Sequence, residues 1–207
     1  MSTDQAVASG RGRAVLSVLG AATLFGTTGT SQALGPSGTT PLGVGAVRIA
    51  IGGAGLFAVL PWIGGSRRDA LSLWRTRWGI LAGLTTALYQ VCFFGGVLRA
   101  GVAVGTLVTI GSGPVFTGLL SWVFLRERPR LTWVVATSVC VVGLVLLIGS
   151  GSSVGEADAL GYLLALASGL GYAFYTVASK RLMNEGHRSD EVMAAAFGLG
   201  GLLLVPV

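Results

Sequence analysis

Residues 102–125 read VAVGTLVTIGSGPVFTGLLSWVFL and contain no charged side chain, whereas residues 126–130 read RERPR. An apolar helix of about 20 residues spans the hydrocarbon core of a bilayer, which is ~30 Å thick. A cluster of basic residues directly after such a stretch is typical of the cytoplasmic end of a membrane span. The segment therefore predicts a transmembrane helix that ends on the cytoplasmic side.

The same pattern of apolar stretches and short polar connections extends along the whole chain. Of its 207 residues, 52% are hydrophobic and 11% are charged, and the mean hydropathy of +0.77 is far above that of soluble domains. Six stretches are long enough to span a bilayer, and the sequence ends within a seventh. The predicted spans are Ala14–Leu34, Leu42–Ile63, Trp78–Leu98, Val102–Leu125, Leu131–Gly149, Leu160–Lys180 and a partial span from Val192 onward.

The distribution of basic residues predicts the orientation of these spans. The formal net charge is +6, but the charges lie between the spans, so we expect no nucleic-acid partner. Only Arg99 lies in an outer connection and only Arg48 lies within a span. The positive-inside rule therefore predicts a cytoplasmic amino terminus in a multi-pass protein of the plasma (inner) membrane. The remaining twelve basic residues occupy alternate, inner segments: Arg11, Arg13, Arg67, Arg68, Arg75, Arg77, Arg126, Arg128, Arg130, Lys180, Arg181 and Arg188.

A weak internal repeat suggests two units. A shift of 147 residues pairs Leu16 with Leu163 and Phe25 with Tyr172, and residues 149–155 read GSGSSVG, a linker-like composition. Because each unit would hold five helices, the second unit would be inverted. The predicted organisation is a cytoplasmic tail (1–13), a first five-helix repeat (14–149), an outer linker (150–159) and the beginning of a second repeat (160–207).

Several short motifs in this order resemble the EamA-type members of the drug/metabolite transporter superfamily. They are Phe25-Gly26 in the first span, Ala46-Val47-Arg48-Ile49-Ala50 in the second, Gly113-Pro114-Val115-Phe116-Thr117 followed by Leu125-Arg126-Glu127-Arg128 in the fourth, and Gly161-Tyr162-Leu163-Leu164-Ala165 in the sixth. The resemblance implies an all-α, polytopic helix bundle with two inverted five-helix repeats. This chain departs from the pattern because it stops at Val207, inside the seventh span, so we expect a truncated second repeat.

Arg48 is the only formal charge well inside a predicted span. A guanidinium at such a depth is costly unless it has a partner or extends towards the interface. Three roles are open: a structural contact between helices, binding of a substrate carboxylate, or a side chain that reaches the membrane surface.

Three spans carry polar and aromatic side chains on one helical face. In the sixth span Ser168, Tyr172, Tyr175 and Ser179 follow the helical spacing, and shorter versions occur in the first and third spans. Such faces suit amphipathic ligands through stacking and a few hydrogen bonds. Hydrogen bonds between helices explain any single residue slightly better, whereas the set as a whole favours a cavity. The predicted substrate cavity comprises Arg48, Thr27, Thr30, Tyr89, Gln90, Phe116, Tyr172 and Tyr175.

Two further features of the fourth span concern its shape and its end. Gly113-Pro114 interrupts the backbone hydrogen bonds near the middle of the helix and predicts a kink, with a gating hinge as its functional interpretation. Glu127 lies among Arg126, Arg128 and Arg130 and is predicted to form a structural ion pair at the membrane boundary rather than to carry protons.

Taken with the resemblance, these features predict a membrane transporter. The expected substrates are small amphipathic metabolites, amino acids or drugs, moved by alternating access, with export as the expected direction. The alternatives are a non-transporting scaffold or inactive fragment and, less favoured, an intramembrane enzyme. No catalytic, metal or cofactor site is expected, because the spans contain no aspartate pair and no His-Glu motif. Expected partners are membrane lipid, the small-molecule substrate, and either a second copy of the chain or the missing helices of the second repeat.

Overall fold

The computed structural model describes residues 15–17, 19–24, 27, 40–149 and 158–205, and all regular secondary structure in them is helical. The chain divides into two compact units, residues 1–39 and 40–207, which are described separately. In the first unit, residues 15–24 include helical turns in which the Thr23 hydroxyl donates to the Leu19 carbonyl. The rest of the predicted first span, including Thr30, lies outside the described residues.

Several helices of the second unit begin with a side-chain cap. Thr40 accepts a hydrogen bond from the Gly43 N–H, and Thr76 accepts one from Gly79 at 3.0 Å. Asp158 accepts one from Gly161 at 2.7 Å. The helices are α2 (Pro41–Val59), the 3₁₀ turn η1 (Leu60–Ile63), α3 (Arg67–Leu73), α4 (Arg77–Ala100), α5 (Val102–Leu125), α6 (Leu131–Gly149), α7 (Ala159–Asn184) and α8 (Ser189–Leu204).

These helices have the composition of a membrane bundle. Within the described residues, four segments are long and apolar enough to cross a bilayer: Leu42–Ile63, Arg77–Ala100, Val102–Leu125 and Ala159–Asn184. Val15–Leu24 and Leu131–Gly143 are shorter apolar helices. The chain is thus a multi-pass helical membrane protein, and the count of six full spans and a partial seventh stays a prediction. The sequence did not predict α3, a short helix behind the cap Ser66.

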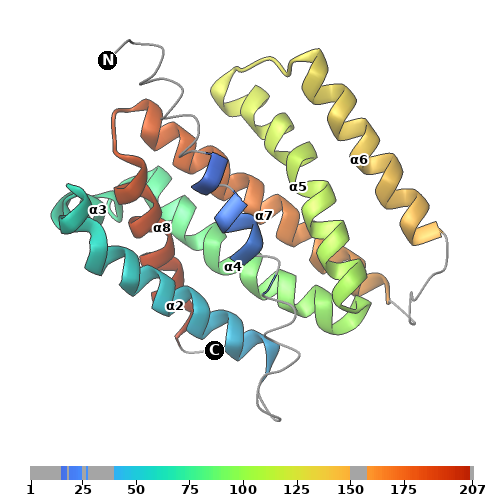
Figure 1. Cartoon of the computed structure of the whole chain (residues 1–207), viewed down its shortest axis with the longest axis horizontal. Helices are drawn as coiled ribbons and strands as arrows, with labels where there is room; N and C mark the ends of the chain where they lie inside the picture. The colour runs from blue at the N-terminus through green and yellow to red at the C-terminus, as the bar shows by residue number, and fades with distance from the viewer. Residues whose placement is uncertain (1–14, 18, 25–26, 28–39, 150–157, 206–207) are drawn as a thin grey trace. The chain divides into compact units, whose positions relative to one another are not determined.

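Helix α7 packs most extensively against α4 and also against α5, while α8 packs against α2 and α4. Figure 1 shows α4 and α7 side by side, with α2 and α8 on one flank and α5 and α6 on the other. Both described helices of the predicted second repeat therefore pack on helices of the predicted first repeat. The repeat boundary stays a prediction, because most of the linker at 150–159 lies outside the described residues.

Small residues allow this close packing. A Cβ atom on Gly96 of α4 would lie 3.0 Å from the backbone nitrogen of Ala165 and 3.2 Å from the carbonyl oxygen of Gly161, both in α7. A Cβ atom on Gly171 of α7 would lie 3.0 Å from Cβ of Tyr89. Such contacts leave no room for a side chain, so α4 and α7 approach through their backbones.

We therefore expect Gly96→Ala to destabilise the protein, since the added methyl group must separate α4 from the α7 backbone. The expected cost is about 1–3 kcal/mol, the usual range for overpacking. Gly52→Ala in α2 is the matched control, because a Cβ atom there meets nothing within 4 Å. That variant should be neutral or slightly stabilising through helix propensity. Thermal unfolding in detergent would measure both, and equal effects would contradict the assignment of Gly96 to a backbone contact.

Candidate functional site

Three of the predicted cavity residues form an aromatic cluster between α4 and α7. The ring centroids of Tyr89 and Tyr172 are 5.9 Å apart, those of Tyr172 and Tyr175 are 5.9 Å apart, and those of Tyr89 and Tyr175 are 6.4 Å apart. The ring of Phe197 in α8 lies 5.9 Å from Tyr175. These separations are typical of favourable aromatic pairs. The cluster, which we call the tyrosine cluster, joins a helix of the predicted first repeat to both described helices of the second.

Burial differs sharply within the tyrosine cluster. Tyr175 is 7% exposed and donates its hydroxyl proton to the Met193 sulfur at 2.7 Å, whereas Tyr172 is 46% exposed. The Ser168 hydroxyl is buried and donates to the Tyr89 carbonyl at 2.9 Å. Ser168 and Tyr175 thus hold α7 against its neighbours, and Tyr172 presents the most accessible ring of the three tyrosines.

Arg48 lies on the α2 side of α4. Its guanidinium carbon is 5.9 Å from the centroid of the Phe94 ring, which is a cation–π distance. The ion pairs of the described residues do not include Arg48. A half-buried guanidinium with an aromatic face as its partner keeps its N–H donors available for an anion.

Gln90 is the most deeply buried of the predicted polar cavity residues that the structure describes. Its side chain is 2% exposed, and the amide nitrogen has no hydrogen-bond partner within the described residues. A buried amide donor without a partner costs free energy that a ligand or a water molecule could recover. Gln90 shares a face of α4 with Phe94, because the two are four residues apart. Gln90 therefore lies on the side of α4 that faces α2, the helix that carries Arg48.

The remaining predicted cavity residues are Phe116, Thr27 and Thr30. Phe116 is half-buried on α5, and the ring contacts among the described residues do not include it. Thr27 belongs to the unit 1–39, where its hydroxyl donates to the Leu24 carbonyl, and Thr30 lies outside the described residues. The assignment of these three residues to a common cavity stays a prediction.

The predicted hinge lies beside Tyr172. Helix α5 continues through Pro114, and a Cβ atom on the buried Gly113 would lie 3.7 Å from Cδ1 of Tyr172. A change in the direction of α5 at this point would therefore alter its contact with the exposed Tyr172 ring. The hinge itself stays a prediction.

Glu127 forms an ion pair with Lys180 near the end of α7, at 2.5 Å. The sequence analysis had named the neighbouring arginines Arg126, Arg128 and Arg130 as its partners. The difference arises because the left-handed cap at Arg126 ends α5 and turns the chain away from the helix axis. The pair ties the end of α5 to the end of α7.

A second ion pair lies at the opposite end of α7. Arg99 at the end of α4 donates to Asp158 before α7 at 2.8 Å. The hydrogen bond from the Gly161 N–H, followed by the one from Arg99, holds the pKa of Asp158 below its usual value, so the carboxylate stays charged at neutral pH. In each of these two ion pairs, both partners thus come from segments that the charge pattern assigns to the same side of the membrane.

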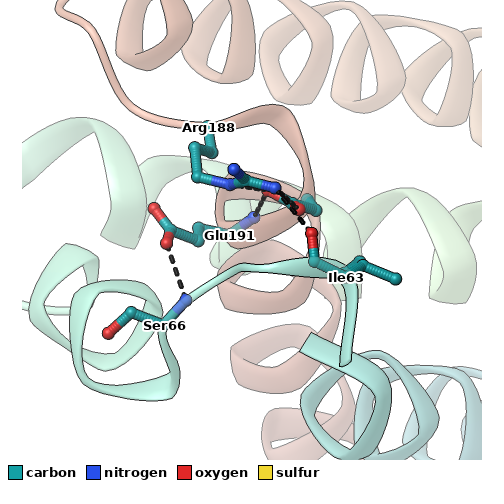
Figure 2. Close-up of polar contacts among 5 residues, drawn as sticks. Ile63, Ser66, Arg188 and Glu191 are labelled. Carbon is teal, nitrogen blue, oxygen red and sulfur yellow. Dashed lines mark hydrogen bonds and ion pairs between the residues drawn. The ribbon is translucent and has the colours of Figure 1, made fainter. Parts of the chain in front are cut away.

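One polar group was missed by the sequence analysis, which placed Glu191 just outside the last span. The Glu191 side chain is 5% exposed and accepts a hydrogen bond from the Ser66 N–H at 2.8 Å. Arg188 donates to the Ile63 carbonyl at 3.0 Å and pairs with Asp190 at 2.7 Å (Figure 2). The hydrogen bond from Arg188 lowers the pKa of Asp190. We call these five residues the α3–α8 latch, because they fasten the start of α8 to the turn between η1 and α3.

Comparison with known proteins places the chain in a family. The family model described as "EamA-like transporter family" matches residues 12–149, and a second, "Solute carrier family 35", matches residues 111–205. The chain is 40% identical over 192 residues to a Bacillus subtilis (strain 168) protein named "Uncharacterized transporter YwfM". The alignment covers 93% of this chain and 63% of that relative, so the chain spans slightly less than two thirds of the relative's length. No solved structure matches. Because the first family match covers well over half of its residues, the chain belongs to the EamA-like transporter family.

Proposed function

We propose that this chain acts in the transport of small amphipathic molecules across the plasma membrane by alternating access, with export as the direction and the amino terminus in the cytoplasm. The observation that carries the proposal is the tyrosine cluster, in which Tyr89 of α4 meets Tyr172 and Tyr175 of α7. In transporters built from two repeats, the substrate site lies where the repeats meet, near the middle of the membrane. The family and the name of the relative favour a transporter over an enzyme.

The chemistry of the site favours a substrate that combines an apolar or aromatic part with a carboxylate. The exposed ring of Tyr172 offers a stacking surface, while the Arg48 guanidinium and the Gln90 amide offer N–H donors. Guanidinium groups bind carboxylates through two parallel hydrogen bonds. Amino acids and amphipathic drugs carry these features, and both substrate classes belong to the proposal.

The polar contacts near the helix ends suggest how access would alternate. The α3–α8 latch and the Glu127–Lys180 pair link the ends where the predicted inner segments lie, and Arg99–Asp158 links the opposite ends. A bundle that opens towards one side must break contacts on that side while contacts on the other side hold. We propose that the α3–α8 latch is closed when the cavity faces outward and opens when the cavity faces the cytoplasm.

Arg48→Gln tests the carboxylate part of the proposal. The variant should raise KM for carboxylated substrates about tenfold or more, in line with the ~1.5–3 kcal/mol typical of hydrogen bonds to charged groups. The measurement is counterflow in proteoliposomes over a panel of amino acids and the corresponding amines that lack the carboxylate. KM for the amines should not change. The control is Arg75→Gln in the exposed connection before α4. An equal effect on amino acids and amines, or no effect on either, would remove Arg48 from substrate binding.

Glu191→Ala tests the proposed latch. Loss of the carboxylate leaves the Ser66 N–H without its acceptor, at a cost of about 1–3 kcal/mol, so the closed population should fall about fivefold or more relative to the open one. Spin labels at Asp69→Cys in α3 and Asn184→Cys at the end of α7, in a Cys92→Ser and Cys140→Ser background, would report this change as longer distances. Arg181→Gln is the control, since it removes only the exposed pair with Glu185. Identical distance distributions in the Glu191→Ala variant and the parent would contradict the proposed role.

A further inference from the structure

A hollow of about 300 Å³ lies between the end of α5 and the start of α6, away from the tyrosine cluster. Its volume is at the lower end of the ~300–1,000 Å³ typical of small-molecule sites. Of the predicted site residues it contains only Glu127. Its lining consists of Thr117, Gly118, Ser121, Glu127, Arg128, Pro129, Arg130, Thr132 and Trp133.

The hollow carries a net positive charge. Arg128 and Arg130 line it, and neither is in an ion pair within the described residues. The Glu127 carboxylate, the acidic group of the lining, is neutralised by Lys180 of α7. Two guanidinium groups with uncommitted N–H donors favour a ligand with several anionic oxygen atoms, and phosphate is the group whose geometry they match best.

The walls of the hollow supply further donors and a fixed shape. The hydroxyls of Thr117, Ser121 and Thr132 line it, and α6 begins there, so the positive end of the α6 helix dipole points into the same space. Gly118 permits this shape, because a Cβ atom on it would overlap the ring of Trp133. The indole therefore packs directly on the α5 backbone and forms one wall.

The position of the hollow favours a lipid over a dissolved anion. It lies where two apolar helices end and the basic connection 126–130 begins, which is the level of the lipid headgroups. Next to its lining, Trp122 is 55% exposed and Leu131 is 77% exposed, so apolar surface continues from the hollow along both helices. A phospholipid could place its phosphate oxygens on the arginines and its acyl chains on this apolar surface, whereas a dissolved anion could use only the arginines.

We propose that this hollow binds the phosphate headgroup of an anionic phospholipid. In this site the Arg128 and Arg130 guanidinium groups hold the phosphate oxygens, and the hydroxyls of the lining bind the glycerol part of the headgroup. The bound lipid bridges α5 and α6 and thereby fixes α6 against its neighbour. This inference does not depend on the proposed transport function, because lipid binding can be measured without any flux.

The test is native mass spectrometry of the delipidated chain in a neutral detergent, titrated separately with phosphatidylglycerol, phosphatidylcholine and sn-glycerol 3-phosphate. Phosphatidylglycerol should bind at least fivefold more tightly than phosphatidylcholine, and glycerol phosphate should bind far more weakly than either lipid. The double variant Arg128→Gln and Arg130→Gln should lose at least tenfold in affinity for phosphatidylglycerol. Arg126→Gln removes one positive charge from the same connection but from outside the lining, and should change the affinity less than twofold.

A second double variant separates binding from folding. Arg128→Lys with Arg130→Lys keeps both charges and should retain most of the affinity. The midpoint temperature of thermal unfolding is measured for each variant. Phosphatidylglycerol should raise this temperature in the parent and in the lysine variant but not in the glutamine variant. An equal loss of affinity in Arg126→Gln, no preference for phosphatidylglycerol over phosphatidylcholine, or glycerol phosphate binding as tightly as the lipid would each overturn the proposal.

Discussion

The backbone contact between α4 and α7 is the constraint on which the rest of this structure depends. Where Gly96 meets Gly161 and Ala165, a Cβ atom on Gly96 would lie about 3 Å from the α7 backbone. With the helices this close, Tyr89 faces Tyr172 and Tyr175, and the Ser168 hydroxyl reaches the Tyr89 carbonyl. A membrane provides no hydrophobic driving force between helices, so close packing and such hydrogen bonds must hold them together.

The polar groups of the bundle are arranged around this interface. Ion pairs and hydrogen bonds join different helices near their ends, whereas the middle of the α4–α7 interface is aromatic and the buried amide of Gln90 lies on the side of α4 that faces α2. Groups near the ends can exchange their partners for water and lipid headgroups at moderate cost, and a buried amide has no such exchange available. This distribution suits a protein whose ends separate in turn while its centre accepts a ligand.

The apolar stretches and the basic connections were sufficient to predict most of the helices, because the length of a membrane helix is set by the bilayer rather than by its neighbours. The spacing of Tyr172 and Tyr175 was sufficient to place them on one face, and the structure brings Tyr89 to that face. The spacing of residues along one helix does not show which other helix packs against that face. The assignment of Phe116 to the same cavity therefore stays a prediction, and Glu127 was paired with its sequence neighbours rather than with Lys180.

Glu191 shows a second limit of the sequence. A carboxylate one residue before an apolar stretch is ordinarily solvated, and only the position of Ser66, 125 residues away, buries it and gives it a donor. The short helix α3 was missed for a related reason, since its seven residues are too few for a periodic pattern. The burial of Glu191 depends on a tertiary contact that no local signal in the chain encodes, whereas α3 has a local signal in its cap Ser66.

If this chain takes part in transport as proposed, the α3–α8 latch must open in each cycle. The most direct test is solute flux in proteoliposomes with Ser66→Cys and Glu191→Cys, in a Cys92→Ser and Cys140→Ser background, joined by a cleavable bis-thiosulfonate crosslinker. We expect saturable flux before crosslinking, loss of flux when the two positions are joined, and recovery when the crosslink is reduced. Undiminished flux in the fully crosslinked protein, or no flux in any state, would contradict it.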